Sequence, residues 1–275
     1  KWNLDFAVIG KTTNTKNIEL LFNNKQVAKI PVNTLVENSP MYDRKWKKSK
    51  LPKKNKIKKD AIKKLQIKDV LKKILSNPNV CSKEWIWQVV AESWRNLISV
   101  GATPMAITNC LNFGSPEKEE NMGEFVECVQ GIGEASEYLK FPVVSGNVSF
   151  YNQTKEIGIK PTPAIGGVGL LKDYKKMVTM DFKQNDNLVL IIGKTEGHID
   201  QSLFARIILD EKNGPPPEVN LFNEKNNGES LLSLINDDLI KSAHDISLGG
   251  ILTALSKMCI KGNKGIKLKK RKNLI

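Results

Sequence analysis

The stretch from residue 104 to residue 149, PMAITNCLNFGSPEKEENMGEFVECVQGIGEASEYLKFPVVSGNVS, decides the fold class. Residues 104–111 and 141–149 are apolar runs of strand length, and between them apolar residues recur at helical spacing over 118–139. A strand, a helix and a strand in this order are typical of an α/β fold. We expect Ser115 to cap the intervening helix, because a serine oxygen can accept a hydrogen bond from a free N–H of the first turn.

The same patterns divide the rest of the chain into four regions. We expect trailing strands of a preceding domain over 1–39, a Lys-rich linker with an amphipathic helix over 40–78, an N-terminal-type α/β domain over 79–171 and a truncated C-terminal-type α+β domain over 172–275. The further strands that we expect are 5–9, 18–22, 26–31, 155–160, 164–171, 187–193 and 265–268, and the further helices are 89–100, 201–209, 218–236 and 247–260. The sequence therefore predicts an α/β to α+β architecture.

The formal net charge of +14 is concentrated in two places. Residues 41–73 carry fifteen Lys or Arg against three acids, and residues 261–275 carry seven Lys or Arg and no acid, so the rest of the chain has a net charge of −5. Lys supplies 39 of the 43 cationic residues, whereas specific readers of nucleic acid favour the planar fork of Arg. We therefore expect a solvated spacer rather than a nucleic acid partner.

Cysteine usage and hydropathy narrow the class of protein further. The four cysteines lie far apart, and two histidines do not complete a paired Cys/His zinc pattern. No apolar run approaches the roughly 20 residues that a membrane-spanning helix needs, and the first residues do not form a signal peptide. These features predict a reduced, cytoplasmic chain with buried thiols and no membrane partner.

A polar run, SGNVS, occupies residues 145–149 and directly follows the apolar residues 141–144. Strand ends that open into Gly, Asn and Ser are where α/β folds present ligands. Gly146 would let the backbone approach a phosphate, Asn147 offers an oxygen that suits Mg²⁺, and Ser149 points to the same side as Asn147 by strand alternation. A hairpin turn with satisfied polar groups is the alternative interpretation.

Two asparagines, Asn109 and Asn112, lie near the end of the earlier apolar run and could converge on the same edge. A side-chain amide can read an adenine edge or a ribose hydroxyl through its paired donor and acceptor groups. Asparagines that close a loop between a strand and a helix are the alternative interpretation.

The run AHDISLGG, which ends at Gly250, precedes a helix-like apolar segment. Glycine weakens the first turn of a helix, and helix N-termini bind phosphate. We therefore interpret His244, Asp245, Ser247, Gly249 and Gly250 as residues that face a phosphate or another ligand. In the alternative interpretation, Asp245 or Ser247 is an N-cap, the histidine is structural and the glycines are packing contacts.

Four segments together resemble one enzyme family. They are AITNCLNFGSPE at 106–117, VSGNVSFYN at 144–152, PTPAIGGVG at 161–169 and AHDISLGG at 243–250. These segments resemble the synthetase subunit of phosphoribosylformylglycinamidine synthase (FGAM synthase subunit II). The LNFG pattern at 111–114 distinguishes that subunit from the related aminoimidazole ribonucleotide synthetase.

The resemblance implies a two-domain, aminoimidazole-ribonucleotide-synthetase-like fold, the second half of a duplicated enzyme. It also implies an ATP-dependent carbon–nitrogen ligase of purine biosynthesis. MgATP would phosphorylate the amide oxygen of formylglycinamide ribonucleotide, and ammonia would then displace the phosphate. Asn109 and Gly146 would contact ATP, Asn147 would ligate Mg²⁺ and Ser149 would contact the ribonucleotide. The implied partners are a glutaminase subunit and a small bridging subunit of the synthase complex.

The chain also departs from the family pattern. It resembles only the end of the first half and most of the second, so the catalytic histidine of the family lies outside it and its own catalytic residues are unknown. We expect several dozen family residues to be missing between Gln88 and Val89, which should expose a sheet edge and apolar surface. Two alternatives stay open: a non-catalytic remnant whose basic linker binds polyanions, and a relative of aminoimidazole ribonucleotide synthetase.

Overall fold

The structure is a computed structural model that describes residues 7–38, 40–48, 66–67, 70, 86–211, 214 and 217–268. The chain divides into two compact units, residues 1–44 and residues 45–275. Most of the expected linker helix, the expected strand residues 5 and 6, and Cys81 lie outside the described residues.

The first unit contains a β-hairpin made of β1 (Asn17–Phe22) and β2 (Lys25–Pro31). Asn23 and Asn24 connect the strands with φ angles of 48° and 61°, a conformation that asparagine tolerates in tight hairpin turns. The expected strands at 18–22 and 26–31 are therefore confirmed. A short helix, α1 (Val32–Val36), follows, and residues 7–9 form no strand, so the described part of the expected strand at 5–9 is wrong.

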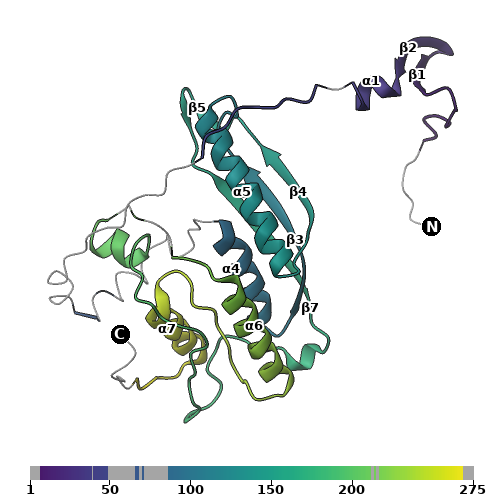
Figure 1. Ribbon diagram of the computed structural model, residues 1–275. Helices are drawn as coiled ribbons and strands as arrows, with labels where there is room; N and C mark the ends of the chain where they lie inside the picture. The colour runs from purple at the N-terminus through teal and green to yellow at the C-terminus, as the bar shows by residue number, and fades with distance from the viewer. Residues whose placement is uncertain are drawn as a thin grey trace. The chain divides into compact units, whose positions relative to one another are not determined.

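The second unit contains the expected α/β core (Figure 1). Strand β3 (Thr103–Asn112) is central, with β4 (Val143–Ser149) parallel to it on one side and β7 (Thr162–Leu170) antiparallel on the other. Helix α5 (Glu119–Tyr138) connects β3 to β4, because parallel neighbours need a crossover connection. These elements confirm the expected helix at 118–139 and the expected strands at 104–111, 141–149 and 164–171.

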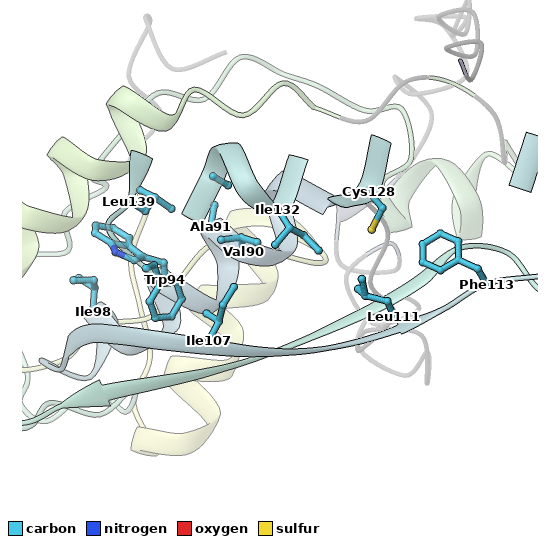
Figure 2. Packing of buried hydrophobic residues seen from close by; sticks show 12 residues of the cluster. Val90, Ala91, Trp94, Ile98, Ile107, Leu111, Phe113, Cys128, Ile132 and Leu139 are labelled. Carbon is cyan, nitrogen blue, oxygen red and sulfur yellow. The ribbon is translucent and has the colours of Figure 1, made fainter. Parts of the chain in front are cut away.

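One face of this sheet packs against α5 and against α4 (Ile86–Ser99), which confirms the expected helix at 89–100. Ile107 and Leu111 of β3 point toward the two helices, as Figure 2 shows. Twelve buried side chains form the core there: Val90, Ala91, Trp94, Ile98, Ile107, Leu111, Phe113, Cys128, Ile132, Ala135, Leu139 and Phe141. Removing this apolar surface from water provides the main driving force for folding of the unit.

The face of the sheet opposite the helices and the two outer edges of the sheet are exposed to solvent. Val168 and Leu170 of β7 are 60% and 52% exposed, and Val144 of the edge strand β4 is 69% exposed. Among the described residues, no strand pairs with the outer edge of β4 or of β7. The expected sheet edge and exposed apolar surface are therefore present.

Helix α5 begins later than its sequence indicates. Its N-cap is Lys118, which makes no side-chain cap, and the Ser115 hydroxyl accepts a hydrogen bond from the Glu117 N–H at 3.3 Å. The Lys118 N–H also reaches the Ser115 carbonyl, so residues 115–118 form a separate turn. Ser115 caps this turn and not the helix, which corrects the expectation.

Apart from an isolated bridge between Thr179 and Ser242, the regular elements described in the C-terminal part of the second unit are helices. They are a 3₁₀ turn (Tyr174–Lys176), a π-helix (Phe204–Ile208), α6 (Leu221–Asn236) and α7 (Gly250–Gly262). The Asn220 side chain caps α6 by accepting from the Asn223 N–H, and the expected helix at 218–236 is confirmed. The π-helix is shorter than the helix expected at 201–209, and α7 begins three residues after the expected Ser247.

Helix α6 packs directly against α4. A Cβ on Gly228 of α6 would overlap the six-membered ring of Trp94 on α4, so glycine is required for this close approach. Beside it, Arg95 Nη1 lies 2.8 Å from Glu224 Oε1, and both side chains are largely shielded from solvent. Two neighbouring residues of α4 therefore connect the sheet layer to the C-terminal helices.

Three expected strands are wrong or much shorter. Residues 187–193 form no strand, and Leu188 and Leu190 are 89% and 67% exposed. Residues 265–268 are irregular, and 155–160 contains only the edge of a small hairpin, β5 (Gln153–Thr154) with β6 (Ile157–Gly158). An apolar run becomes a strand only beside a partner strand, and among the described residues 187–193 has none.

The thiols are only partly as expected. Cys128 is fully buried, and burial raises the pKa of its thiol to about 12. Cys110 and Cys259 are free and partly exposed, so the expectation of buried thiols holds for one of the three described cysteines. Within the described residues, no helix has both the length and the apolar character that crossing a membrane requires.

Candidate functional site

The register between β3 and β4 places Asn109 directly beside Gly146. A Cβ on Gly146 would collide with the Asn109 side-chain oxygen and would lie 2.7 Å from the Asn109 backbone oxygen. Glycine is therefore the residue that leaves the Asn109 amide in place. These two sequence-predicted residues, both assigned to ATP, are brought together.

Asn147 and Ser149 lie on the opposite face of the sheet. They are the register neighbours of Cys110 and Asn112, and the Asn112 amide contacts the Cys110 sulfur at 3.5 Å on that face. Successive side chains of a strand alternate between faces. Asn147 and Ser149 therefore share a face as expected, whereas Asn109 and Asn112 do not converge, which corrects the sequence interpretation.

The Ser149 hydroxyl is held by its neighbours in the chain. The Asn152 amide donates to the Ser149 hydroxyl at 3.2 Å and to the Ser149 carbonyl at 2.9 Å. The same amide donates to the Phe113 carbonyl at 3.2 Å, which connects the ends of β3 and β4. This pattern resembles the hairpin alternative at Ser149, because local groups already occupy the hydroxyl.

Three phenylalanines anchor these strand ends. The rings of Phe113 and Phe150 each meet Phe125 of α5 edge to face, with centroids 5.3 Å and 4.9 Å apart. Such aromatic pairs contribute about 0.5 to 1.5 kcal/mol beyond the burial of their area. The polar strand ends are thus mounted on a rigid apolar support.

His244 and Asp245 form a buried pair ahead of α7. His244 Nδ1 lies 2.9 Å from Asp245 Oδ1, and the two side chains are 12% and 9% exposed. Burial by itself would raise the pKa of Asp245, but the hydrogen bond and charge interaction with His244, together with the nearby Arg95, outweigh it and lower the pKa below its usual value. Among the described residues, His244 Nε2 and Asp245 Oδ2 are buried without a hydrogen-bond partner, so both have unused binding capacity.

The two glycines that follow have a backbone role. Gly249 is the N-cap of α7 with φ at 88°, and Gly250 has φ at 72°. Only glycine adopts such angles without strain. This accounts for both glycines without a ligand, and the Gly250 N–H donates to the Ser247 carbonyl at 3.0 Å. Neither Asp245 nor Ser247 is the N-cap, which corrects the alternative interpretation.

A cavity of about 260 Å³ lies between α4 and β7, on the face of the sheet that carries Asn109. Its polar lining comes from one face of α4: Glu92, Ser93 and Asn96. Sequence reasoning did not assign these residues to a site. The signal that could have identified them is the position of these three polar residues on one face of a helix whose other face is apolar and packs in the core.

The cavity offers the ligand atoms that a hard cation prefers. Glu92 supplies a carboxylate and Asn96 an amide oxygen one turn later, and Mg²⁺ binds through such oxygens with the help of water and phosphate. Asn147 supplies a single amide oxygen on the other face. Within the described residues there is no cluster of three or more His, Cys, Asp or Glu that could hold a metal ion by itself.

Two protein-family models match consecutive parts of the second unit. Residues 74–171 match "AIR synthase related protein, N-terminal domain", and residues 184–272 match "AIR synthase related protein, C-terminal domain". Together these matches cover more than half of the chain. They agree with the two-domain, aminoimidazole-ribonucleotide-synthetase-like fold expected from the sequence.

Two individual relatives are PurL subunits of phosphoribosylformylglycinamidine synthase. The chain is 67% identical to the phosphoribosylformylglycinamidine synthase subunit PurL of Pelagibacter ubique, over 100% of this chain and 45% of that protein. It is 38% identical to the PurL subunit of Azorhizobium caulinodans, over 96% of this chain and 43% of that protein. The chain therefore spans less than half the length of these relatives.

The alignment with the P. ubique protein runs over 326 positions, whereas this chain has 275 residues. At least 51 positions of that relative therefore have no counterpart within the aligned part of this chain.

Two solved structures from Thermotoga maritima are also similar. "T. maritima PurL complexed with ATP" is 22% identical with a TM-score of 0.40, covering 59% of this chain and 32% of that one. "Structure of PurLQS from Thermotoga maritima" is 23% identical with a TM-score of 0.43, covering 60% and 33%. The two domain matches show that the chain belongs to the AIR synthase related proteins, and the relatives named above, of which it spans less than half, are PurL subunits of phosphoribosylformylglycinamidine synthase.

Proposed function

We propose that this chain is part of an ATP-dependent ligase that forms formylglycinamidine ribonucleotide from formylglycinamide ribonucleotide, ATP and glutamine-derived ammonia. The observation that carries the proposal is the 67% identity to a PurL subunit over the whole chain. Because the chain spans only 45% of that relative, the activity belongs to a larger assembly of which this chain supplies one portion.

Asn109 and Gly146 are the proposed ATP contacts. Gly146 leaves room for the Asn109 amide, which offers one donor group and one acceptor group on the face that also borders the cavity. Ile165 of β7, the register neighbour of Asn109, lines that cavity together with Ser93 of α4. A nucleotide at this position would lie between the sheet and α4.

Asn147 is the proposed Mg²⁺ ligand and Ser149 the proposed ribonucleotide contact, both on the other face of the sheet. A Mg²⁺ ion there would take one oxygen from Asn147 and the rest from water and from the phosphate of a ligand on that same face, such as the ribonucleotide proposed to contact Ser149. The unpartnered atoms of His244 and Asp245 make that pair, with Ser247 and the glycine turn, the proposed second ligand-facing segment.

Phosphoryl transfer needs little from the protein besides position and charge stabilisation. The residues of this chain therefore act by binding and orienting, and Mg²⁺ supplies the charge that neutralises the phosphates. The rigid aromatic support beneath the strand ends suits that task, because small displacements of bound groups slow such reactions strongly. A glutaminase subunit and a small bridging subunit are the proposed partners that deliver ammonia.

The proposal is tested by nucleotide binding to two matched variants of the same strand. We expect Asn109→Ala to weaken binding of MgATP by about three- to tenfold, the effect of losing one or two neutral hydrogen bonds. Asn112→Ala, which removes the same group from the opposite face of β3, is expected to leave the affinity unchanged. The measurement is titration calorimetry with MgATP, and equal affinities for the two variants would refute the Asn109 assignment.

The enzymatic part of the proposal is tested separately. The chain, supplied with the remainder of a PurL subunit and with ammonia, is expected to support ATP-dependent formation of the amidine, detected by mass spectrometry of the ribonucleotide. ATP binding without amidine formation under these conditions would reduce the chain to a non-catalytic nucleotide-binding remnant. The names of the relatives give no support to aminoimidazole ribonucleotide synthetase as the function.

A further inference from the structure

We propose that the first two turns of α5 form a docking surface for a basic extended segment, and that residues 45–48 of this same chain are its occupant. The two partners are separated by about seventy residues in the sequence but belong to the same compact unit. Residues 45–48 form no helix or strand, and Figure 1 shows this part of the chain near the end of α5.

The backbone makes the most specific contact. The Lys47 N–H donates to the Glu119 carbonyl at 3.1 Å, although Glu119 is already the first residue of α5. Four residues later, Gly123 is buried beneath the Lys47 backbone, and a Cβ at Gly123 would overlap the Lys47 carbonyl oxygen and lie 2.9 Å from its carbon. The absence of a side chain at Gly123 therefore creates the space that the Lys47 peptide fills.

Charge complementarity adds to this contact. Lys47 Nζ lies 2.8 Å from Glu119 Oε2 and 3.5 Å from Glu120 Oε1, and all three side chains are more than a third exposed. The hydrogen bond and charge of Glu119, followed by Glu120, raise the pKa of Lys47 above its usual value. Exposed ion pairs of this kind are weak and are screened by salt. They favour a basic segment at this position, whereas the backbone contact fixes which residue of the segment lies over Gly123.

The docking contact also bears on the role of the Lys-rich region. At least one cation of the Lys-rich region is thus paired with acids of its own chain, in accord with a spacer rather than a nucleic-acid-binding arm.

The experiment compares two glycines of the same helix in the full chain. Gly123→Ala is expected to release the segment, whereas Gly133→Ala is the matched control, because nothing lies within 4 Å of a Cβ at Gly133. Hydrogen exchange followed by mass spectrometry is expected to show about tenfold faster exchange for a peptide covering residues 45–48 in Gly123→Ala only, the effect of losing roughly one hydrogen bond and its ion pairs. Tryptic cleavage after Lys48 should accelerate in parallel.

A second pair of variants covers the case in which Gly123→Ala disturbs α5 itself, which would appear as faster exchange across residues 124–138. Lys47→Glu leaves the helix sequence intact and places a like charge beside Glu119 and Glu120, so it should also release the segment. Lys45→Glu makes the same charge change two residues away and should have a smaller effect. Equal exchange of residues 45–48 in Gly123→Ala and Gly133→Ala, or in Lys47→Glu and Lys45→Glu, would overturn the proposal.

Discussion

Individual glycines of this chain serve different physical purposes. Gly146 and Gly123 have no room for a side chain, because Asn109 and the Lys47 backbone occupy that space. Gly249 and Gly250 instead supply positive φ angles at the start of α7. The glycine run before α7, which suggested a phosphate site from sequence, therefore has a sufficient conformational explanation, and the ligand-facing interpretation rests on His244 and Asp245.

The buried His244–Asp245 pair predicts a pH dependence of stability. The pKa of Asp245 is lowered in the folded state, so its ionised form contributes stability above its ordinary pKa of about 4, and this contribution is lost as the pH falls below that value. Asp245→Asn should therefore show a shallower fall of unfolding free energy between pH 5 and pH 2 than the wild type, measured by urea unfolding. The exposed Asp186→Asn serves as control, and a wild-type slope in Asp245→Asn would contradict the prediction.

At the scale of elements, α4 is the connecting helix of the second unit. Its apolar side contributes Val90 and Trp94 to the core, its polar side lines the cavity, and Arg95 pairs with Glu224 of α6. Sequence periodicity located this helix correctly but could not show that Trp94 meets Gly228. That contact depends on which helix packs beside α4, and a local pattern does not contain this information.

The α4–α6 contact predicts opposite effects for two glycine substitutions. Gly228→Ala should destabilise the chain by about 1 to 3 kcal/mol, because the added methyl group overlaps the Trp94 ring. Gly133→Ala, in the interior of α5 with open space around it, should stabilise by about 0.5 to 1 kcal/mol through helix propensity. Urea unfolding measures both, and a Gly228→Ala variant as stable as the wild type would show that the helices are not packed at this distance.

At the scale of the whole molecule, the described residues leave two apolar surfaces exposed. Residues 188–192 are an apolar run without a strand partner among the described residues, and the sheet has one face covered by helices and one face open. The alignment with the P. ubique relative includes at least 51 positions that have no counterpart in this chain. Extended apolar patches of this kind are typical of interfaces or of surfaces that another segment covers.

Because residues 188–192 are exposed, we expect them to contribute little to the free energy of unfolding and to bind a hydrophobic dye. Leu188→Ala combined with Leu190→Ala should change the unfolding free energy by less than about 0.5 kcal/mol, as for other exposed positions, and should lower the fluorescence of bound anilinonaphthalene sulfonate. Leu139→Ala, at a position that is 4% exposed, should instead cost about 2 to 5 kcal/mol. A large loss of stability in the double variant would show that the run is buried in solution.

The sequence by itself determined the elements whose signals are local. Apolar residues at helical spacing identified α5, the same kind of pattern indicated α4 and α6, short apolar runs with turn residues identified β1 to β4 and β7, and dense motifs indicated the family. Only the tertiary structure decided that Asn109 and Asn112 face opposite sides of β3, that residues 187–193 remain irregular, and that Gly123 receives the Lys47 backbone. The physical reason is that a strand register, a partner for an apolar run and a close backbone contact each depend on residues distant in the chain, whereas helical periodicity and turn chemistry depend on near neighbours.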